Sequence, residues 1–375
     1  MVVSWYSPKD AETMFTGVFH YEQAMALKSL CDTALYYPYD TALDVPFTKG
    51  VERGLMTYRR KMATQRIPLL TSLAERMQII SDLRRICKEF QPDVLHAHCA
   101  FNAGNIVAIF GKLFGYPVVI TEHSPMEQMR LQIPRVKSKM HYAYANSDAN
   151  ICVSSHSMKG LQEQFPDCKF QVIYNGILSP ENMEMDGQKY ARDGKVNCCI
   201  VAGFYSIDIK GYQYLLPAIA QLKAEGMPIV LHICGGGEYF DHFVNMAREL
   251  GIEDDCIFYG NCPKAKVYSI VSQMDFNISA SLYECSGVSV EEALLLKKPM
   301  LVTTSGGANS LVTEETAIVV EKGSTQALVD GIREMVKRLP EFDPDKIYNY
   351  AFNNFEIGQV SQQHYQLYQS ILERK

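Results

Sequence analysis

The chain lacks the sequence features that mark several classes of protein. Its 11 cysteines include no Cys-x-x-Cys pair, which argues against a zinc site and suits a reducing compartment. No apolar run approaches the roughly 20 residues of a membrane-spanning helix, and the start of the chain, Met1-Val-Val-Ser4, lacks the basic region of a secretory leader. Neither Gly-x4-Gly-Lys-Ser/Thr nor Gly-x-Ser-x-Gly is present. We therefore expect a cytoplasmic protein that is neither a P-loop nucleotidase nor a Gly-x-Ser-x-Gly hydrolase.

Charge is unevenly distributed along the sequence. The formal net charge is −6, of which the first 178 residues contribute +3 and the remainder −9. An acidic second half argues against a nucleic-acid partner. Basic residues concentrate in Arg53–Arg66 and Arg130–Lys139, where they are interleaved with large apolar side chains. These segments fit either solvated amphipathic helices or contacts with an anionic membrane surface, and the sequence leaves both interpretations open.

Strand-like and helix-like segments alternate over the whole chain, which predicts an α/β protein with parallel sheets. The strands expected in the first half are Val2–Tyr6, Thr33–Tyr37, Val94–Ala97, Pro117–Thr121, Ala149–Val153 and Phe170–Ile173. Those expected in the second half are Asn197–Ala202, Ile229–Cys234, Cys256–Tyr259, Asp275–Ser279, Met300–Thr303 and Ala317–Val320. The turn signal Asn175-Gly176 and the polar stretch after it indicate a domain boundary. We therefore expect domains at 1–177 and 178–354, followed by a helix.

Two glutamates separated by seven residues, Glu284 and Glu292, stand out in the second half. Glu284 follows a predicted strand, and Glu292 lies in a segment rich in Ala and Leu that predicts a helix. Gly287 between them lets the backbone pass close to a ligand. A strand, a small-residue turn and a helix form an anion site, because the first helical N–H groups have no partner within the helix. The spacing alone fits either two carboxylates flanking the phosphates of a nucleotide-sugar or an ordinary helix with solvated acids.

Further motifs follow an order that resembles the retaining glycosyltransferases of family 4, which have the GT-B fold. The Glu284-x7-Glu292 pattern continues into Ala293-Leu-Leu-Leu-Lys-Lys-Pro299 as it does in that family. The other motifs are Phe15-Thr-Gly-Val-Phe19, Asp93-Val-Leu-His-Ala-His98, Thr121-Glu-His-Ser124, Val172-Ile-Tyr-Asn-Gly-Ile177, Val201-Ala-Gly203, Lys210-Gly211, Ile233-Cys-Gly-Gly-Gly-Glu238 and Ser305-Gly-Gly307. The resemblance implies two Rossmann-like doubly wound domains facing across a cleft. It also implies an acceptor-side N-terminal domain, to which the C-terminal helix at 355–375 crosses back.

The same resemblance implies a reaction and a set of site residues. A sugar would pass from a nucleoside-diphosphate sugar to a glycan or lipid-linked acceptor, with retention of configuration and without a metal or cofactor. Surface polysaccharide or glycolipid synthesis would be the setting, in the cytoplasm or at the inner face of the membrane. The residues implied are His123 near the reacting sugar, and Gly17, Gly203, Lys210, Glu284, Gly287, Val288, Ser289 and Glu292 at the donor. Lys210 and Glu284 are implied in catalysis as well. We also expect His98 to border the cleft and His96 to face the opposite way.

Two positions depart from the family pattern. Phe204 stands where many members carry an arginine, and Ser310 stands where they usually carry a glutamate. Two alternatives to a transferase therefore stay open. One is a GT-B isomerase that acts on a nucleotide-sugar without an acceptor. The other, which Phe204 favours, is a catalytically weak protein that binds a nucleotide-sugar or a partner enzyme. Sugar, nucleotide, acceptor and linkage depend on loops outside these motifs.

Overall fold

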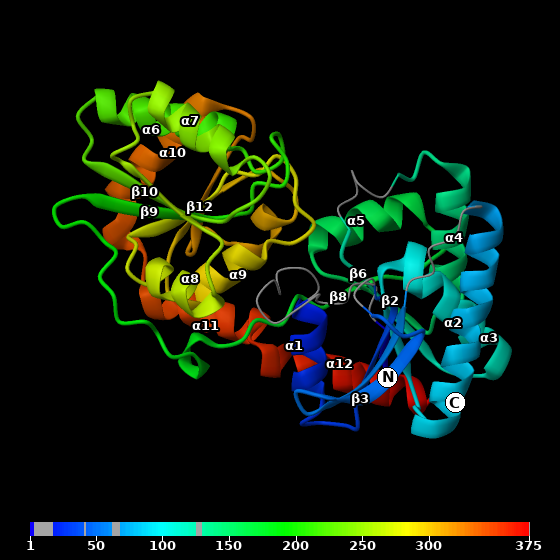
Figure 1. The fold of residues 1–375 in the computed structure, drawn as a ribbon. Helices are drawn as coiled ribbons and strands as arrows, with labels where there is room; N and C mark the ends of the chain where they lie inside the picture. The colour runs from blue at the N-terminus through cyan, green and yellow to red at the C-terminus, as the bar shows by residue number, and fades with distance from the viewer. Residues whose placement is uncertain (4–17, 41–42, 62–67, 125–129, 375) are drawn as a thin grey trace. The chain divides into compact units, whose positions relative to one another are not determined.

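The computed structural model describes residues 1–3, 18–40, 43–61, 68–124 and 130–374. They form two compact units, each a sheet with helices on both faces (Figure 1). Unit 1 comprises Met1–Gly176 and Ile357–Lys375, and unit 2 comprises Ile177–Glu356. The C-terminal helix thus belongs to the unit that contains the N-terminus. Within the described ranges, no helix combines the length and the apolarity that crossing a membrane requires.

Unit 1 is built on an eight-stranded sheet in the order β3-β4-β2-β1-β5-β6-β7-β8. Its neighbouring strands are parallel except for the antiparallel pair β3 and β4. The strands are β1 (Val2–Val3), β2 (Ala34–Asp40), β3 (Phe47–Glu52), β4 (Leu55–Lys61), β5 (Leu95–His98), β6 (Val118–Glu122), β7 (Ala149–Cys152) and β8 (Gln171–Val172). Val2 pairs with Leu35 on one side and with His96 on the other, so β1 lies inside the sheet.

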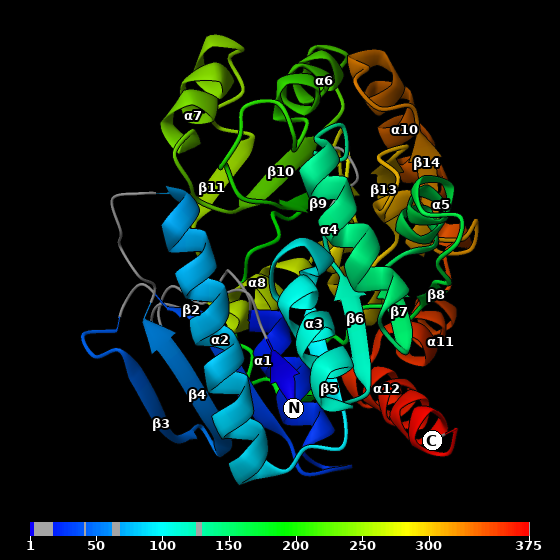
Figure 2. The same cartoon turned by 90° about the vertical axis from the view of Figure 1, so that its right-hand side faces the viewer.

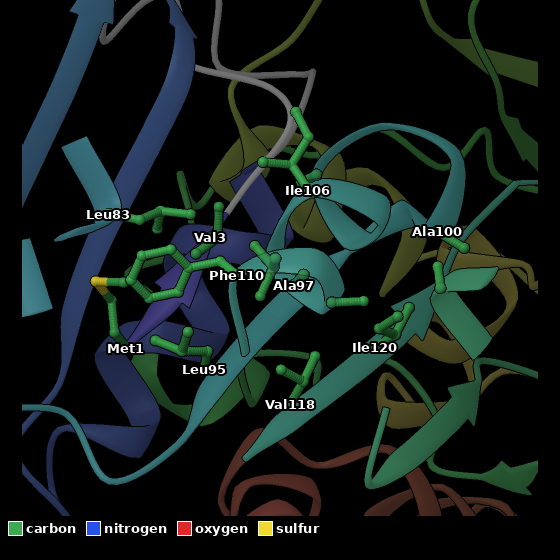
Figure 3. Close-up of a cluster of buried hydrophobic side chains, with 14 of the residues drawn as sticks. Met1, Val3, Leu83, Leu95, Ala97, Ala100, Ile106, Phe110, Val118 and Ile120 are labelled. Atoms are coloured by element: carbon green, nitrogen blue, oxygen red, sulfur yellow. The ribbon is translucent and has the colours of Figure 1, made fainter. Parts of the chain in front are cut away.

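Alternate residues of these strands face two different layers of helices. On one face, residues such as Val3 and Leu95 pack against α2, α3 and α4 (Figures 2 and 3), where Phe110 of α3 lies among them. The opposite face packs against α1 and α12 through residues such as Val2 and Val119. Burial on both faces explains why these strands are nearly continuous apolar runs. The helices are α1 (Val18–Leu27), α2 (Pro68–Phe90), α3 (Asn105–Phe114), α4 (Pro134–Ala145), α5 (Ser155–Gln164) and α12 (Ile357–Leu372).

The basic segment Arg53–Arg66 contains a strand, so its interpretation as an amphipathic helix is wrong for the described part. β3 and β4 form a hairpin that turns at Arg53 and Gly54, which have φ of 48° and 83°. Two successive residues with positive φ are typical of the tight turns that join antiparallel strands. Along β4 the buried Leu55 and Thr57 alternate with the half-buried Met56, as expected for a strand.

Unit 2 contains a six-stranded, fully parallel sheet in the order β11-β10-β9-β12-β13-β14. Its strands are β9 (Val196–Val201), β10 (Ile229–Cys234), β11 (Cys256–Gly260), β12 (Phe276–Ser279), β13 (Met300–Thr303) and β14 (Ala317–Val320). Helices α6, α7 and α10 cover one face, and α8, α9 and α11 cover the other (Figure 1). These helices are α6 (Tyr212–Ala224), α7 (Phe240–Glu249), α8 (Lys264–Val271), α9 (Val288–Leu295), α10 (Thr325–Arg338) and α11 (Pro344–Phe355).

The strand order of unit 2 reverses direction at its first strand. From β9 the chain adds β10 and β11 on one side, and it then returns to add β12, β13 and β14 on the other. Ligands of open α/β sheets bind at such a switch point, outside the carboxyl ends of the strands. A ligand site is therefore expected at the loops that follow β9 and β12.

Candidate functional site

Lys210 and Glu284 meet at the switch point of unit 2. Lys210 lies in the loop after β9 and Glu284 in the loop after β12. Lys210 Nζ lies 2.5 Å from Glu284 Oε1, and the Ser281 hydroxyl donates to the same oxygen at 2.8 Å. The two side chains of the ion pair are 29% and 21% exposed, so a ligand can reach both. Two residues that are 74 positions apart thus form one charged pair where a ligand is expected.

The loop after β13 fixes the backbone of Glu284. The Glu284 N–H donates to the carbonyl of Ser305 at 2.9 Å, and its own carbonyl accepts from the N–H of Gly307 at 2.9 Å. A Cβ on Gly307 would lie 2.4 Å from the backbone carbon of Cys285. Only glycine permits that approach, so the Ser305-Gly-Gly307 turn holds the Glu284 loop in place.

Gly211 brings the loop after β9 against the end of β12. Its φ is +75°, and a Cβ there would lie 1.9 Å from the carbonyl oxygen of Ala280. Both facts require glycine, and they fix the position of the preceding Lys210. Gly203 lies earlier in the same loop, where a Cβ would come within 2.5 Å of the ring of Tyr205.

Helix α9 begins beside this pair. The carbonyl of Gly287 accepts the first helical hydrogen bonds, from the N–H groups of Val290 at 2.7 Å and Glu291 at 3.0 Å. The N–H groups of Val288 and Ser289 precede these bonds in the chain. The first N–H groups of a helix, together with its dipole, attract anions. The predicted turn and helix start therefore lie where the sequence places them, next to the ion pair.

Glu292 is not a solvated helix acid. Its side chain is 14% exposed, and its Oε1 lies 3.3 Å from Lys264 Nζ. The hydroxyl of Tyr268 donates to the same oxygen at 3.3 Å. Burial raises the pKa of Glu292, while Lys264 and Tyr268 act in the opposite direction. Both partners come from α8, so α8 and α9 together hold this carboxylate.

The neighbouring Glu291 is fully buried. The hydroxyl of Ser286 donates to its Oε1 at 2.9 Å. Its Oε2 has no hydrogen-bond partner within the part of the chain that the structure describes. Burial, and to a lesser extent the nearby Glu292, raise the pKa of Glu291 to about 8, so this carboxyl group is mainly protonated at neutral pH.

Phe204 points into the core of unit 2 and not toward the ligand edge. Its side chain is fully buried, with the ring 4.4 Å from that of Tyr212 and 5.4 Å from that of Phe243, measured between centroids. The phenyl ring therefore completes an aromatic cluster between the sheet and helices α6 and α7. This position supplies packing in place of the cation that many family members carry here.

The remaining predicted residues belong to unit 1. His123 follows β6, and its Nε2 lies 2.8 Å from Nδ1 of His98 at the end of β5. The expectation that His96 faces away from His98 is wrong, because their rings stack with centroids 4.7 Å apart. Residues two apart on a strand share a face, since the side-chain period is two. Gly17 lies outside the described residues.

Sequence reasoning missed several residues that shape the unit 2 site. Lys264 and Tyr268 hold Glu292, and Ser281 contacts Glu284. Their contacts with these acids depend on how strands and helices pack. The adjacent acids at 291 and 292 could have signalled that one of them is buried. Two successive helical residues point in different directions, so only one of the two acids can face a ligand.

Two protein-family models match the chain. The model described as "Glycosyl transferases group 1" matches residues 183–351, and the model described as "Glycosyltransferase Family 4" matches residues 40–178. Together the two matches span more than four fifths of the chain. A similar curated protein is the alpha-monoglucosyldiacylglycerol synthase of Streptococcus pneumoniae, which is 24% identical over 292 residues. The match covers 72% of this chain and 66% of that protein, slightly less than two thirds of its length.

Solved structures of similar fold cover the chain almost completely. Sucrose-phosphate synthase from Thermosynechococcus elongatus aligns over 100% of both chains, with a TM-score of 0.82 and 15% identity. Anabaena HepE in complex with UDP aligns over 98% of this chain and 99% of that one, with a TM-score of 0.74 and 16% identity. The predicted GT-B fold is thus confirmed, and the chain belongs to the family 4 glycosyltransferases.

Proposed function

We propose that the protein transfers a sugar, with retention of configuration, from a nucleoside-diphosphate sugar to a lipid-linked or glycan acceptor. The observation that carries the proposal is the contact of Lys210 with Glu284 at the switch point of unit 2, beside the start of α9. A cation, a carboxylate and a helix N-terminus in one place suit a ligand with both phosphates and hydroxyl groups.

The diphosphate binds at the N–H groups of Val288 and Ser289, with Lys210 beside them. Gly287 keeps the approach clear of a side chain. As the bond from the sugar to the phosphate breaks, negative charge grows on the leaving nucleoside diphosphate. Fixed donors and a cation stabilise that charge, which is the largest contribution to be expected from such a site.

Glu284 accepts hydrogen bonds from hydroxyl groups of the donor sugar, and Glu292 accepts them from the ribose. In the absence of ligand, Lys210 and Ser281 hold Glu284, and Lys264 and Tyr268 hold Glu292. Each carboxylate is therefore oriented before the donor arrives, which lowers the cost of ordering on binding.

Phe204 leaves the diphosphate with fewer cations than in many family members. In our proposal Lys210 and the α9 terminus carry this charge together. The reaction proceeds without a metal ion, as the family resemblance implies. His123 of unit 1 donates a hydrogen bond to the reacting sugar or relays a proton from the acceptor hydroxyl.

An acceptor anchored in a membrane fits the basic segment Arg130–Lys139. Arg130, Arg135 and Ile133 are exposed in and before α4. Each cation near an anionic surface contributes about 1 kcal/mol. The hairpin contributes less, because Arg59 lies 2.7 Å from Asp40 and is only 15% exposed. The similar S. pneumoniae protein is named as a glycolipid synthase, which supports a lipid acceptor.

Nucleotide release tests this function. The protein is incubated with a panel of nucleoside-diphosphate sugars, with and without a diacylglycerol-type acceptor in vesicles. The proposal predicts release that depends on the acceptor, persists in a chelator and gives a product with the donor's anomeric configuration by NMR. Conversion of the donor without an acceptor would indicate the isomerase instead. Binding without turnover on any donor would indicate a catalytically weak binding protein.

Calorimetry tests the donor site independently of the acceptor. Replacing Glu292 with alanine should weaken nucleoside-diphosphate binding at least about tenfold, because a charge-assisted hydrogen bond contributes roughly 1.5–3 kcal/mol. Replacing the exposed Glu249 at the end of α7 is the matched control. Unchanged affinity in the Glu292 variant would contradict the assignment of this residue to the nucleotide.

A further inference from the structure

Unit 1 contains a cluster of histidines between its sheet and helices α1 and α12. They come from four separate parts of the chain and are His20, His96, His98, His123 and His364. Four of them are buried, and His123 is half-buried. The proposed transfer reaction uses only His123, so the rest of the cluster calls for an explanation.

Three members of this cluster, His20, His98 and His123, have ring nitrogens that lie near one another. The ring centroids of His20 and His98 are 4.2 Å apart, and those of His20 and His123 are 5.1 Å apart. His98 Nδ1 lies 2.8 Å from His123 Nε2. Taking one ring nitrogen from each residue, the three atoms lie within 4.8 Å of one another.

All three imidazoles are neutral at physiological pH. Burial is the main cause, and it lowers the pKa of His20 and His98 well below the ordinary value and that of His123 to about 3. Neutral imidazole is the form of histidine that coordinates metals, through the ring nitrogen that carries no proton.

One buried nitrogen of the cluster lowers the stability of the folded protein. His98 Nε2 is buried and has no hydrogen-bond partner among the residues described in the structure. Such a group lowers stability, because it has lost its water partners on folding without gaining a partner in the protein. When His98 carries its proton on Nδ1, the lone pair of Nε2 can bind a cation, and a bound cation would offset this cost.

We propose that His20, His98 and His123 bind one divalent transition-metal ion such as Zn²⁺. Three histidines with a fourth position open to water are a known zinc arrangement, with Zn–N distances of about 2.0–2.1 Å. Nitrogens around a tetrahedral ion are then roughly 3.4 Å apart. Nitrogens that lie up to 4.8 Å apart must therefore move closer together before all three can bind one ion, and this requires the rings to rotate.

The surroundings of the three ligands are already ordered. His96 stacks on His98, and its two nitrogens lie 2.6 Å from the hydroxyl of Tyr368 and 2.7 Å from that of Thr121. Residues behind the ligands commonly orient them in metal sites. An ion bound here would also occupy His123 and so inhibit transfer; this last consequence, unlike the binding itself, rests on the proposed function.

Cobalt titration of the full chain tests the site. The tag-free protein, first treated with a chelator, is titrated with Co²⁺, and the visible absorption typical of a tetrahedral ion is recorded. We expect one equivalent to bind with this signal and Zn²⁺ to displace it. His20→Gln and His98→Gln should each weaken binding about a hundredfold or more, since loss of an outer-shell partner alone costs roughly 10–100-fold.

Two matched variants separate this site from other histidines. His242→Gln alters an exposed histidine of α7, and His141→Gln removes a member of the other potential ligand group, His141, Asp167 and Cys168. Both should keep the tetrahedral signal. Circular dichroism identifies which variants are folded. Absence of the signal in the wild type, or its survival in a folded His20→Gln or His98→Gln protein, would overturn the proposal. Nucleoside-diphosphate binding, measured in parallel, tests the transferase assignment separately.

Discussion

Replacing Glu291 with glutamine should stabilise the protein, by an amount that grows with pH. The carboxyl group is fully buried, accepts a hydrogen bond from Ser286 at 2.9 Å and lies in the first turn of α9. Glutamine has nearly the same shape as a protonated glutamic acid, so the hydrogen bond and the packing can both persist. What the change removes is a group that resists losing its proton in the folded state.

The size of the effect follows from the pKa of about 8 in the folded state, compared with the ordinary glutamate value of 4.5. Between these two values the unfolded chain has lost a proton that the folded chain keeps, so stability falls as pH rises. The penalty is absent below pH 4.5 and constant above pH 8. At about 1.4 kcal/mol per pH unit, the variant should gain about 1 kcal/mol at pH 5, about 3 kcal/mol at pH 7 and about 5 kcal/mol at pH 9.

Calorimetric or urea unfolding of the full chain at these three pH values measures the difference. Glu249→Gln, at an exposed position, is the control for replacing a glutamate by glutamine. The decisive quantity is the pH dependence of the difference from wild type. A Glu291→Gln difference that is the same at pH 5 and pH 9, or that changes sign, would refute the reasoning and indicate an ionised, compensated carboxylate.

Four further outcomes are expected. Gly211→Ala should destabilise unit 2 by roughly 3 kcal/mol or more in urea unfolding, because the new Cβ would overlap a backbone oxygen. The control Gly226→Ala, at a residue with φ +86° but open space around it, should cost only about 1–2 kcal/mol. Equal losses in the two variants would contradict the steric argument. Lys210→Ala should lower the single-turnover rate at least about tenfold; a loss below about threefold would mean that the diphosphate charge is held elsewhere. Acid should unfold unit 1, because its five clustered histidines have lowered pKa values in the folded state. The stability that is present above pH 6.5 therefore falls below pH 6.5, at about 1.4 kcal/mol per histidine per pH unit. A circular dichroism spectrum that is unchanged down to pH 4 would contradict this. The protein should sediment with anionic vesicles at low salt and be released at high salt, and Arg130→Ser with Arg135→Ser should weaken sedimentation; equal binding to neutral vesicles would exclude an electrostatic contact.

The sequence by itself determined the fold class and most of the strands. Ile229–Cys234, Met300–Thr303 and Ala317–Val320 have the predicted bounds. They are apolar runs that end at turn residues, and a strand buried on both faces leaves that pattern in any context. The family followed from the ordered motifs, in which glycines such as Gly211 allow two loops to pack closer than any side chain would permit.

Only the tertiary structure decided which side chains meet. Lys264 reaches Glu292 from another helix, and His20 reaches His98 from another layer, so neither contact leaves a local signal. The β3–β4 hairpin escaped prediction because its basic and aromatic residues also fit an amphipathic helix. Glu291 and Glu292 are neighbours of the same residue type, yet one is buried as an acid and the other meets a lysine. Packing around each carboxylate, which depends on distant parts of the chain, sets that difference.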